Sequence, residues 1–125
     1  NVSILGAISK REVPAWLMMG DIFLNTTCYE SFGISVLEAA SVGLPIVTTA
    51  VGELPYLWQH EQTALLVPPD DAFAIAEAVL RLLNEPDLAE KLSRNARLRA
   101  EQFDWSLILP QWESLFQELA GMETQ

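Results

Sequence analysis

The chain has 125 residues, half of them apolar, and carries a formal net charge of −10 from 17 acidic and 7 basic side chains. This length and composition suit one globular domain with its own core rather than a disordered segment. We find no apolar run of the roughly 20 residues that span a membrane, and no signal-type segment at the N-terminus. Five of the seven bases fall between Arg81 and Arg99, interleaved with acids, which makes nucleic acid a poor partner.

Cys28 is the single cysteine, so neither an intrachain disulfide nor a cysteine-rich zinc site is available. A cytoplasmic location fits this composition, and attachment to the cytoplasmic membrane surface stays open. Cys28 has no histidine near it in sequence and is interpreted as a core or loop thiol. His60 stands beside Glu61 and is interpreted as a solvated turn residue rather than a base or a metal ligand.

The first part of the chain, residues 1–69, alternates short apolar runs with helical segments. The Ser9–Glu12 spacing of a capping box predicts a helix that ends near Gly20, and a second helix is expected over 33–42. Apolar runs predict strands over 2–5, 22–27, 45–49 and 63–67. Continuous apolar strands between helices indicate a parallel sheet covered on both faces.

The second part, residues 70–125, is expected to be helical. Its first two helices have apolar stripes, predicted as Phe73, Ala76, Leu80 and Leu83 and then as Leu88, Leu92, Ala96 and Phe103. Glu77 and Arg81 have the i,i+4 spacing of an ion pair. A last helical segment after Asp104 carries a predicted packing face that includes Trp105, Trp112 and Phe116, and Pro110 is expected to kink or restart it.

Two glutamates, Glu30 and Glu38, stand eight residues apart in a stretch that is otherwise free of charge. Between Ser31 and Gly52, Glu38 is the one side chain charged at pH 7, and it lies on an otherwise apolar helix. Burying a carboxylate is costly unless something satisfies it, so this pattern favours a polar ligand or a strong internal partner. Gly33 begins the helix, and the free N–H groups there would favour a phosphate.

Each glutamate also has a simpler interpretation. Glu30 can be an acid near a helix N-terminus, where it stabilises the helix by less than about 1 kcal/mol. Glu38 can be satisfied by Ser35, by Ser41 or by a neighbouring backbone group. From the residues themselves, both interpretations stay open.

The segment from Asp21 to Ala40 resembles the E-x7-E signature of retaining glycosyltransferases of the GT-B fold, of the group 1, family 4 type. The likeness continues through 43–49, 51–52, 65–69 and 103–105, and so covers essentially the whole chain. It implies a Rossmann-like, three-layer α/β/α domain with a parallel sheet of about four strands, followed by C-terminal helices. The chain would then be the later part of the C-terminal, nucleotide-sugar-binding domain, and an incomplete half of a GT-B enzyme of carbohydrate biosynthesis.

The resemblance also implies roles for individual residues. Glu30, as the catalytic carboxylate, would contact the hydroxyls of the donor sugar near the reacting carbon, and Glu38 would hold the ribose hydroxyls of the nucleotide. The backbone N–H groups of the substrate-binding residues Phe32, Gly33, Ile34 and Ser35 would hold sugar hydroxyls and the diphosphate. The family transfers a sugar from a nucleotide diphosphate sugar to an acceptor, with retention at the anomeric carbon and with neither a metal nor another cofactor.

Departures from the family pattern leave the donor open: Glu53, Tyr56 and Ala64 stand where the family often has Gly, Glu and Gly. The family's cationic pair and its acceptor site lie upstream, so we expect the chain to need the N-terminal domain of the same protein and to be inactive without it. Two other interpretations remain. The chain can be a non-catalytic nucleotide-binding or regulatory module, or an assembly module that self-associates through Trp112 and Phe116.

Overall fold

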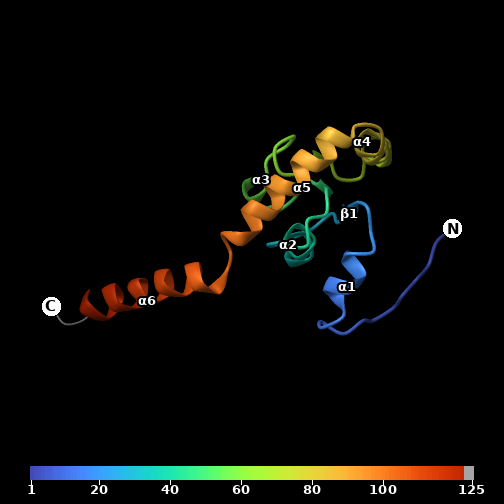
Figure 1. Cartoon of the computed structure of the whole chain (residues 1–125). Helices are drawn as coiled ribbons and strands as arrows, with labels where there is room; N and C mark the ends of the chain where they lie inside the picture. Colours follow the sequence, from blue (N-terminus) through green and yellow to red (C-terminus); the bar gives the residue numbers. More distant parts are fainter. Residues whose placement is uncertain (123–125) are drawn as a thin grey trace.

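A computed structural model describes residues 1–122 (Figure 1). Its first part alternates helices and strands, and its last part is helical, as the sequence predicts. In chain order the elements are α1 (Val13–Leu17), β1 (Phe23–Asn25), α2 (Ile34–Ser41), β2 (Ile46–Thr49), α3 (Leu54–Leu57), β3 (Leu65–Val67), α4 (Ala72–Asn84), α5 (Pro86–Glu101) and α6 (Trp105–Met122).

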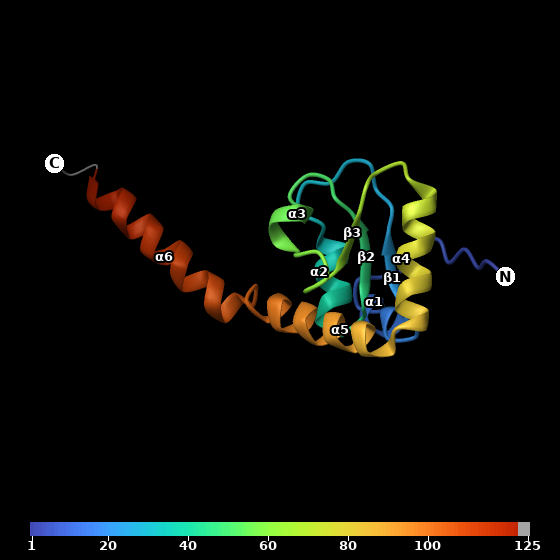
Figure 2. The ribbon, with the colours of Figure 1, turned by 90° about the horizontal axis from the view of Figure 1, so that it is seen from above.

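The strands form one parallel sheet in the order β1-β2-β3 (Figure 2). The middle strand, β2, is buried along its whole length. Its two threonines are polar groups inside this sheet, and polar groups there need partners. The side-chain nitrogen Nδ2 of Asn25 donates to Oγ1 of Thr48, its register partner on β2, at 3.1 Å. Short parallel strands with such cross-strand pairs are held by helices on both faces.

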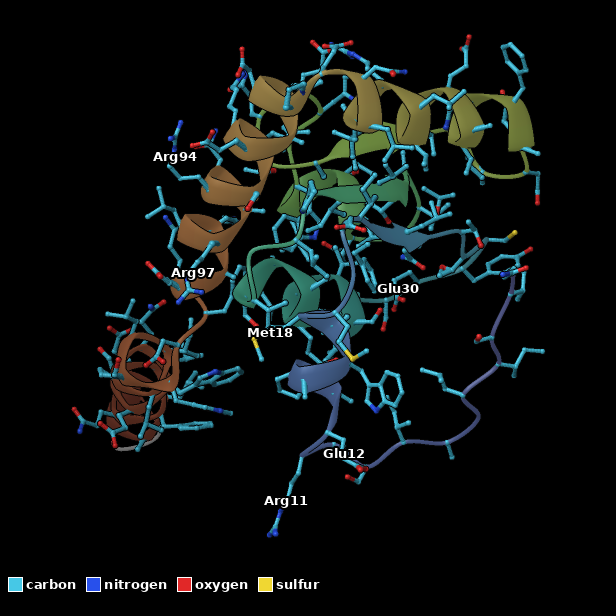
Figure 3. All side chains as sticks on the ribbon, turned by 45° about the vertical axis from the view of Figure 1, so that its right-hand side comes forward. Arg11, Glu12, Met18, Glu30, Arg94 and Arg97 are labelled. Carbon is cyan, nitrogen blue, oxygen red and sulfur yellow. The ribbon has the colours of Figure 1, made fainter. Side chains whose placement is uncertain are left out.

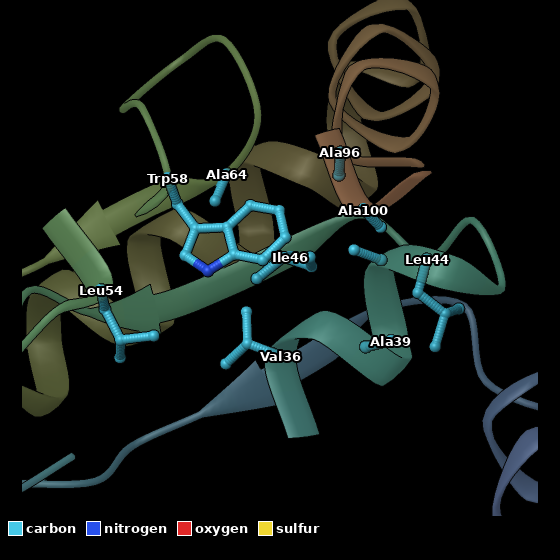
Figure 4. Packing of buried hydrophobic residues seen from close by; sticks show 10 residues of the cluster. Val36, Ala39, Leu44, Ile46, Leu54, Trp58, Ala64, Ala96 and Ala100 are labelled. Atoms are coloured by element: carbon cyan, nitrogen blue, oxygen red, sulfur yellow. The ribbon is translucent and has the colours of Figure 1, made fainter. Parts of the chain in front are cut away.

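One face of the sheet carries the larger apolar cluster, shown in Figure 4. Ile46 of β2 packs there with Val36 of α2, Leu54 of α3 and Trp58, which follows α3. These four side chains are at most 1% exposed. Fully burying a side chain of this size stabilises the fold by about 1.5–3 kcal/mol, so this cluster fixes how α2 and α3 sit on the sheet.

The opposite face of the sheet is covered by α4. Val47 of β2 and Leu65 of β3 pack there against Leu82 of α4. Helix α5 contributes to both clusters, through Leu92 on this face and Ala96 on the other. Figure 2 shows α5 crossing the end of the sheet at which the strands begin. The loops that follow the strands therefore gather at the other end, and the three-layer α/β/α prediction is confirmed.

The expected strand over residues 2–5 is wrong, and the sheet of the described residues has three strands rather than four. Val2 and Ile4 are 91% and 92% exposed, and their segment has no regular secondary structure. An apolar run becomes a strand only where its backbone pairs with a neighbouring strand. No described strand lies beside this segment.

The buried face of α4 also differs from the predicted stripe. Phe73, Leu80 and Leu83 are 73%, 55% and 61% exposed, whereas Ala78 and Leu82 are buried. This helix is apolar around much of its circumference, so two different stripes have helical periodicity. Contact with β2 and β3 selects the stripe that contains Ala78 and Leu82.

Local side-chain bonds agree with the sequence only in part. The backbone N–H of Ser9 donates to Oε2 of Glu12 at 3.2 Å, as in a capping box, and the Ser9 hydroxyl donates to the same atom at 2.6 Å. The reciprocal bond of a capping box is replaced, because the Glu12 N–H donates to the backbone carbonyl of Ser9, and α1 begins only after Glu12, which is its N-cap. Arg81 does not pair with the acid four residues before it. It contacts the carboxylate of Glu61 and, at 3.1 Å, Oε1 of Glu85.

Helix α6 stands away from the body of the molecule (Figures 1 and 2). It is one uninterrupted helix with Pro110 inside it, so the expected restart does not occur. Trp105, Trp112 and Phe116 are 72%, 49% and 61% exposed, and the predicted packing face is therefore not covered by the described part of the chain. Among residues 1–122, no helix has the length and apolar character that crossing a bilayer requires.

Candidate functional site

The loop over residues 26–33 follows β1 and leads into α2, at the end of the sheet where ligands bind in open α/β folds. Two threonine hydroxyls give this loop its shape. Oγ1 of Thr49, the last residue of β2, donates to the carbonyl oxygen of Thr27 at 2.6 Å. Oγ1 of Thr27 donates to the carbonyl oxygen of Tyr29 at 3.1 Å. The loop is therefore hydrogen-bonded both to the sheet and within itself.

Glu30 is half-buried in this loop, and its Oε1 accepts from the backbone N–H of Ser31 at 3.0 Å. In Figure 3, Glu30 lies on one side of α2, while Arg94 and Arg97 of α5 lie on the other. No ion pair joins Glu30 to a basic side chain among residues 1–122. The second carboxylate oxygen, Oε2, is therefore available to a ligand.

Gly33 connects the Glu30 loop to α2 and to α3. It has φ of 82°, in the left-handed region that favours glycine. A Cβ at this position would lie 2.5 Å from Cδ2 of Leu54, and 3.6 Å from Cγ of Glu30. Glycine thus allows the helix start, the Glu30 side chain and α3 to meet at one point.

The first turn of α2 offers unused hydrogen-bond donors. Ile34 and Ser35 are exposed, and no described group accepts from their backbone N–H groups. The N-cap, Gly33, has no side chain that could accept from the helix start. Free N–H groups and the positive end of the helix dipole together favour an anion such as a phosphate.

The side chain of Phe32 packs against an aromatic residue just after the end of α5. It is half-buried, and its ring meets the ring of Phe103 edge-on, with centroids 5.7 Å apart. The guanidinium of Arg99 lies over the same Phe103 ring, 5.1 Å from its centroid. The ring of Phe32 is therefore packed just after the end of α5, and its assigned role in ligand binding concerns its backbone N–H.

Glu38 lies on α2, four residues after its start, and is exposed. The expectation of a buried charge on an apolar helix is therefore wrong. The proposal that Ser41 satisfies the carboxylate is also wrong, because Oγ of Ser41 donates to the backbone carbonyl of Glu38 at 2.7 Å. No described group donates to the Glu38 carboxylate.

The surroundings of Glu38 differ from those of Glu30. Glu38 lines a shallow cavity of about 360 Å³ between α2 and the end of α5, and Glu30 does not take part in it. The other residues lining this cavity are Leu37, Ser41, Arg97, Ala100, Glu101, Phe103 and Asp104. The structure thus brings Glu30, Gly33 and the start of α2 together, and Glu38 lies one turn further along the same helix.

The basic side chains of α4 and α5 are engaged in local contacts. Lys91 donates to the carbonyl oxygen of Glu61 at 3.0 Å, and Arg97 donates to that of Ser41 at 3.0 Å. Arg99 donates to the carbonyl oxygen of Leu57 at 3.2 Å. In residues 1–122, no group of three or more His, Cys, Asp and Glu side chains is placed to hold a metal ion.

Cys28 and His60 both have specific partners. The exposed Cys28 donates through Sγ to Oδ1 of Asp70 at 3.1 Å, and this bond, together with the Asp70 charge, raises the pKa of the thiol. It links the loop after β1 to the loop after β3. His60 is exposed, as the sequence predicts, but its Nδ1 accepts from the backbone N–H of Leu66 at 3.0 Å.

Comparison with known proteins identifies relatives for almost the whole chain. A family model described as glycosyl transferases group 1 matches residues 1–99. The chain is 30% identical over 120 residues to the alpha-D-kanosaminyltransferase of Streptomyces kanamyceticus, covering 95% of this chain and 31% of that protein. It is 34% identical over 105 residues to a glycogen synthase of Mycobacterium tuberculosis, covering 83% and 25%. The chain thus spans between a quarter and a third of the length of these relatives.

Solved structures share the fold. Sucrose-phosphate synthase from Thermosynechococcus elongatus matches with a TM-score of 0.89 and 33% identity, over 96% of this chain and 30% of that one. HepE of Anabaena, in complex with UDP and glucose, matches with a TM-score of 0.87 and 23% identity, over 93% and 32%. The second likeness concerns the fold only.

Proposed function

Since this chain belongs to the group 1 glycosyltransferases, we propose that it forms the later part of the C-terminal, donor-binding domain of a retaining glycosyltransferase. The observation that carries this proposal is the Glu30 loop. This loop places the Glu30 carboxylate, whose Oε2 has no partner among the described residues, beside the start of α2. The first N–H groups of α2, which has Gly33 as its N-cap, also have no acceptor among these residues. Such a pair suits a ligand with hydroxyls at one end and phosphates next to them.

In this proposal each part of the site binds one part of a nucleotide diphosphate sugar. Oε2 of Glu30 accepts from hydroxyls of the donor sugar near the reacting carbon. The N–H groups of Ile34 and Ser35, with those of Phe32 and Gly33, hold sugar hydroxyls and the diphosphate. Glu38, exposed and without a donor among the described groups, accepts from the ribose hydroxyls.

The reaction transfers the sugar to an acceptor, with retention at its anomeric carbon. As the bond to the diphosphate breaks, negative charge grows on the leaving oxygens, and preorganised N–H donors stabilise it without a metal ion. The local contacts of Lys91, Arg97 and Arg99 leave these cations occupied. We therefore propose that another part of the full-length protein supplies the neutralising cations and the acceptor site, and that the chain by itself does not catalyse transfer.

The role of Glu30 is tested in the full-length protein by Glu30→Gln, which removes the charge and keeps the shape. We expect sugar transfer to fall by about 100-fold or more, while the free energy of unfolding changes by less than about 1 kcal/mol. Glu77→Gln is the matched control, because Glu77 is an exposed acid on α4, which covers the opposite face of the sheet. Normal turnover in Glu30→Gln would remove Glu30 from the reaction.

The role of Glu38 is tested by binding. We expect Glu38→Ala to raise the Kd of the nucleotide sugar by about 10-fold, measured by calorimetry, because one charged acceptor is lost. Glu101→Ala, on the same cavity, controls for the change in local charge and should alter Kd by less than about 3-fold. An unchanged Kd in Glu38→Ala would contradict the ribose assignment.

A second candidate function is assembly, and the exposed face of α6 is the observation that favours it. The chain would then self-associate, or join the N-terminal domain of the same protein, through Trp112 and Phe116. A non-catalytic nucleotide-binding module on this scaffold is the remaining alternative. It would bind the nucleotide sugar but show no transfer in the full-length protein, with or without Glu30.

A further inference from the structure

Thr49 connects the middle strand of the sheet to the loop that carries Glu30. It ends β2 and its side chain is fully buried. Its Oγ1 donates to the carbonyl oxygen of Thr27 at 2.6 Å. Thr27 lies between the end of β1 at Asn25 and Glu30, so this bond acts on the backbone three residues before the carboxylate.

The Thr49 hydroxyl replaces a bond that the backbone of the sheet no longer provides. The ladder between β1 and β2 ends at the pair Asn25 and Thr48. Beyond it, β2 pairs with β3 only: Thr49 is the register partner of Val67, and Ala50 N–H donates to the carbonyl oxygen of Val67 at 2.8 Å. Without the hydroxyl, the loop after β1 would lose its hydrogen bond to the middle strand.

The other contacts of the loop are weaker constraints. Cys28 donates to Asp70 through an exposed thiol, and thiols are weak donors. Gly52 lies against the backbone carbonyl of Glu30, a steric contact that limits motion in one direction only. The bond from Thr49 is a stronger constraint, because its hydroxyl donor is fully buried and water competes less for a part-buried bond than for an exposed one.

We propose that Thr49 is a positioning residue, which sets the place of the Glu30 carboxylate through the Thr27 carbonyl. This inference rests on the proposed role of Glu30. A misplacement of about 1 Å at a reacting group can cost on the order of 100-fold in rate. Loss of the Thr49 hydroxyl should therefore act on the rate of transfer and not only on stability.

The test compares two neighbouring buried threonines in the full-length protein. Thr49→Val removes the hydroxyl and keeps the shape, and should lower kcat by about 10-fold or more, with KM for the donor changed by less than about 3-fold. Thr49→Ser keeps the hydroxyl and should restore kcat to within about 3-fold of the unmodified protein. Thr48→Val is the matched control, because Thr48 is equally buried on the same strand but bonds Asn25, within the sheet.

Rates are compared per folded molecule, with the folded fraction taken from circular dichroism. If Thr49→Val does not fold, Thr49→Ala gives the same comparison with a smaller side chain. A kcat equal to that of Thr48→Val would overturn the inference. So would a further loss when Thr49→Val is added to Glu30→Gln, since a residue acting through Glu30 has no effect once Glu30 is disabled.

Glu30→Gln measured in the same assay separates the two proposals. If it keeps full turnover, the proposed function fails, whatever Thr49 does. If it loses turnover while Thr49→Val keeps it, only the positioning inference fails.

Discussion

Gly52 lies so close to Glu30 that a Cβ on Gly52 would stand 1.7 Å from the Glu30 carbonyl oxygen. Gly52 also has φ of 55°, in the region that side chains rarely adopt. The loop after β2 is therefore folded directly onto the loop after β1. Gly33, on the other side of Glu30 in the chain, also has a positive φ, but a Cβ there would meet the side chain of Leu54 at 2.5 Å rather than the Glu30 backbone.

Gly52→Ala should destabilise the protein and displace the Glu30 loop. The Cβ would meet a backbone oxygen that cannot move without moving the loop, and the positive φ adds strain, so we expect a loss of more than about 2 kcal/mol in the free energy of unfolding. Gly43→Ala is the control, because Gly43 has φ of 81° but its nearest contact, Oγ of Ser93, would lie at 3.6 Å. It should cost about 1 kcal/mol. Equal losses in urea unfolding would contradict the steric argument.

The Cys28 thiol should react slowly with alkylating reagents. Its bond to Asp70 and the charge of that carboxylate both raise the pKa of the thiol, so less thiolate is present at a given pH. Asp70→Asn removes the charge and should lower this pKa and increase the alkylation rate near pH 8 by roughly 3-fold to 10-fold. Asn tolerates the φ of 58° at this position.

Alkylation is followed with iodoacetamide across a range of pH, and Cys28 is the single reacting thiol. Asp87→Asn, which removes an acid from α5, serves as the control. A pH–rate profile that does not move to lower pH in Asp70→Asn would show that the bond to Asp70 does not control the thiol.

The sequence predicted the buried strand β2 and the helix that begins at Gly33. It did not predict which apolar segments are exposed to solvent. Residues 45–49 were expected as a strand and β2 is Ile46–Thr49, because a strand covered on both faces must be continuously apolar. Residues 2–5 have the same apolar character but no neighbouring strand. Apolar composition by itself does not show whether a partner is present.

In the candidate site, the sequence likewise predicted local features but not the contacts between residues that are far apart in the chain. The helix start at Gly33 and the positions of Glu30 and Glu38 follow from local pattern. The bonds from Thr49 to Thr27 and from Cys28 to Asp70 join residues 22 and 42 positions apart, and a single sequence holds no direct record of such pairs. The available signal was weak: Thr48 and Thr49 are polar residues at the end of a buried apolar strand, and such groups need partners.

The corrected face of α4 can be tested by two truncations. Leu82→Ala should cost about 2–5 kcal/mol, because Leu82 is 3% exposed in the cluster with Val47, Leu65 and Leu92. Phe73→Ala removes a larger side chain that is 73% exposed, and should change the free energy of unfolding by less than about 0.5 kcal/mol. If denaturant titrations showed a larger loss in the free energy of unfolding for Phe73→Ala than for Leu82→Ala, the stripe predicted from the sequence would be the buried one.

Helix α6 should make the chain, studied by itself, self-associate. Trp112 and Phe116 stack with ring centroids 5.7 Å apart and are exposed, so association would bury a continuous apolar face. The net charge of −10 opposes this, and added salt should therefore strengthen association by screening the repulsion. Trp112→Ser should weaken the dimer by about 10-fold or more in sedimentation, whereas Glu113→Gln, which leaves the apolar face intact, should not weaken it. Concentration-independent sedimentation of the unmodified chain at high salt would exclude assembly through this face.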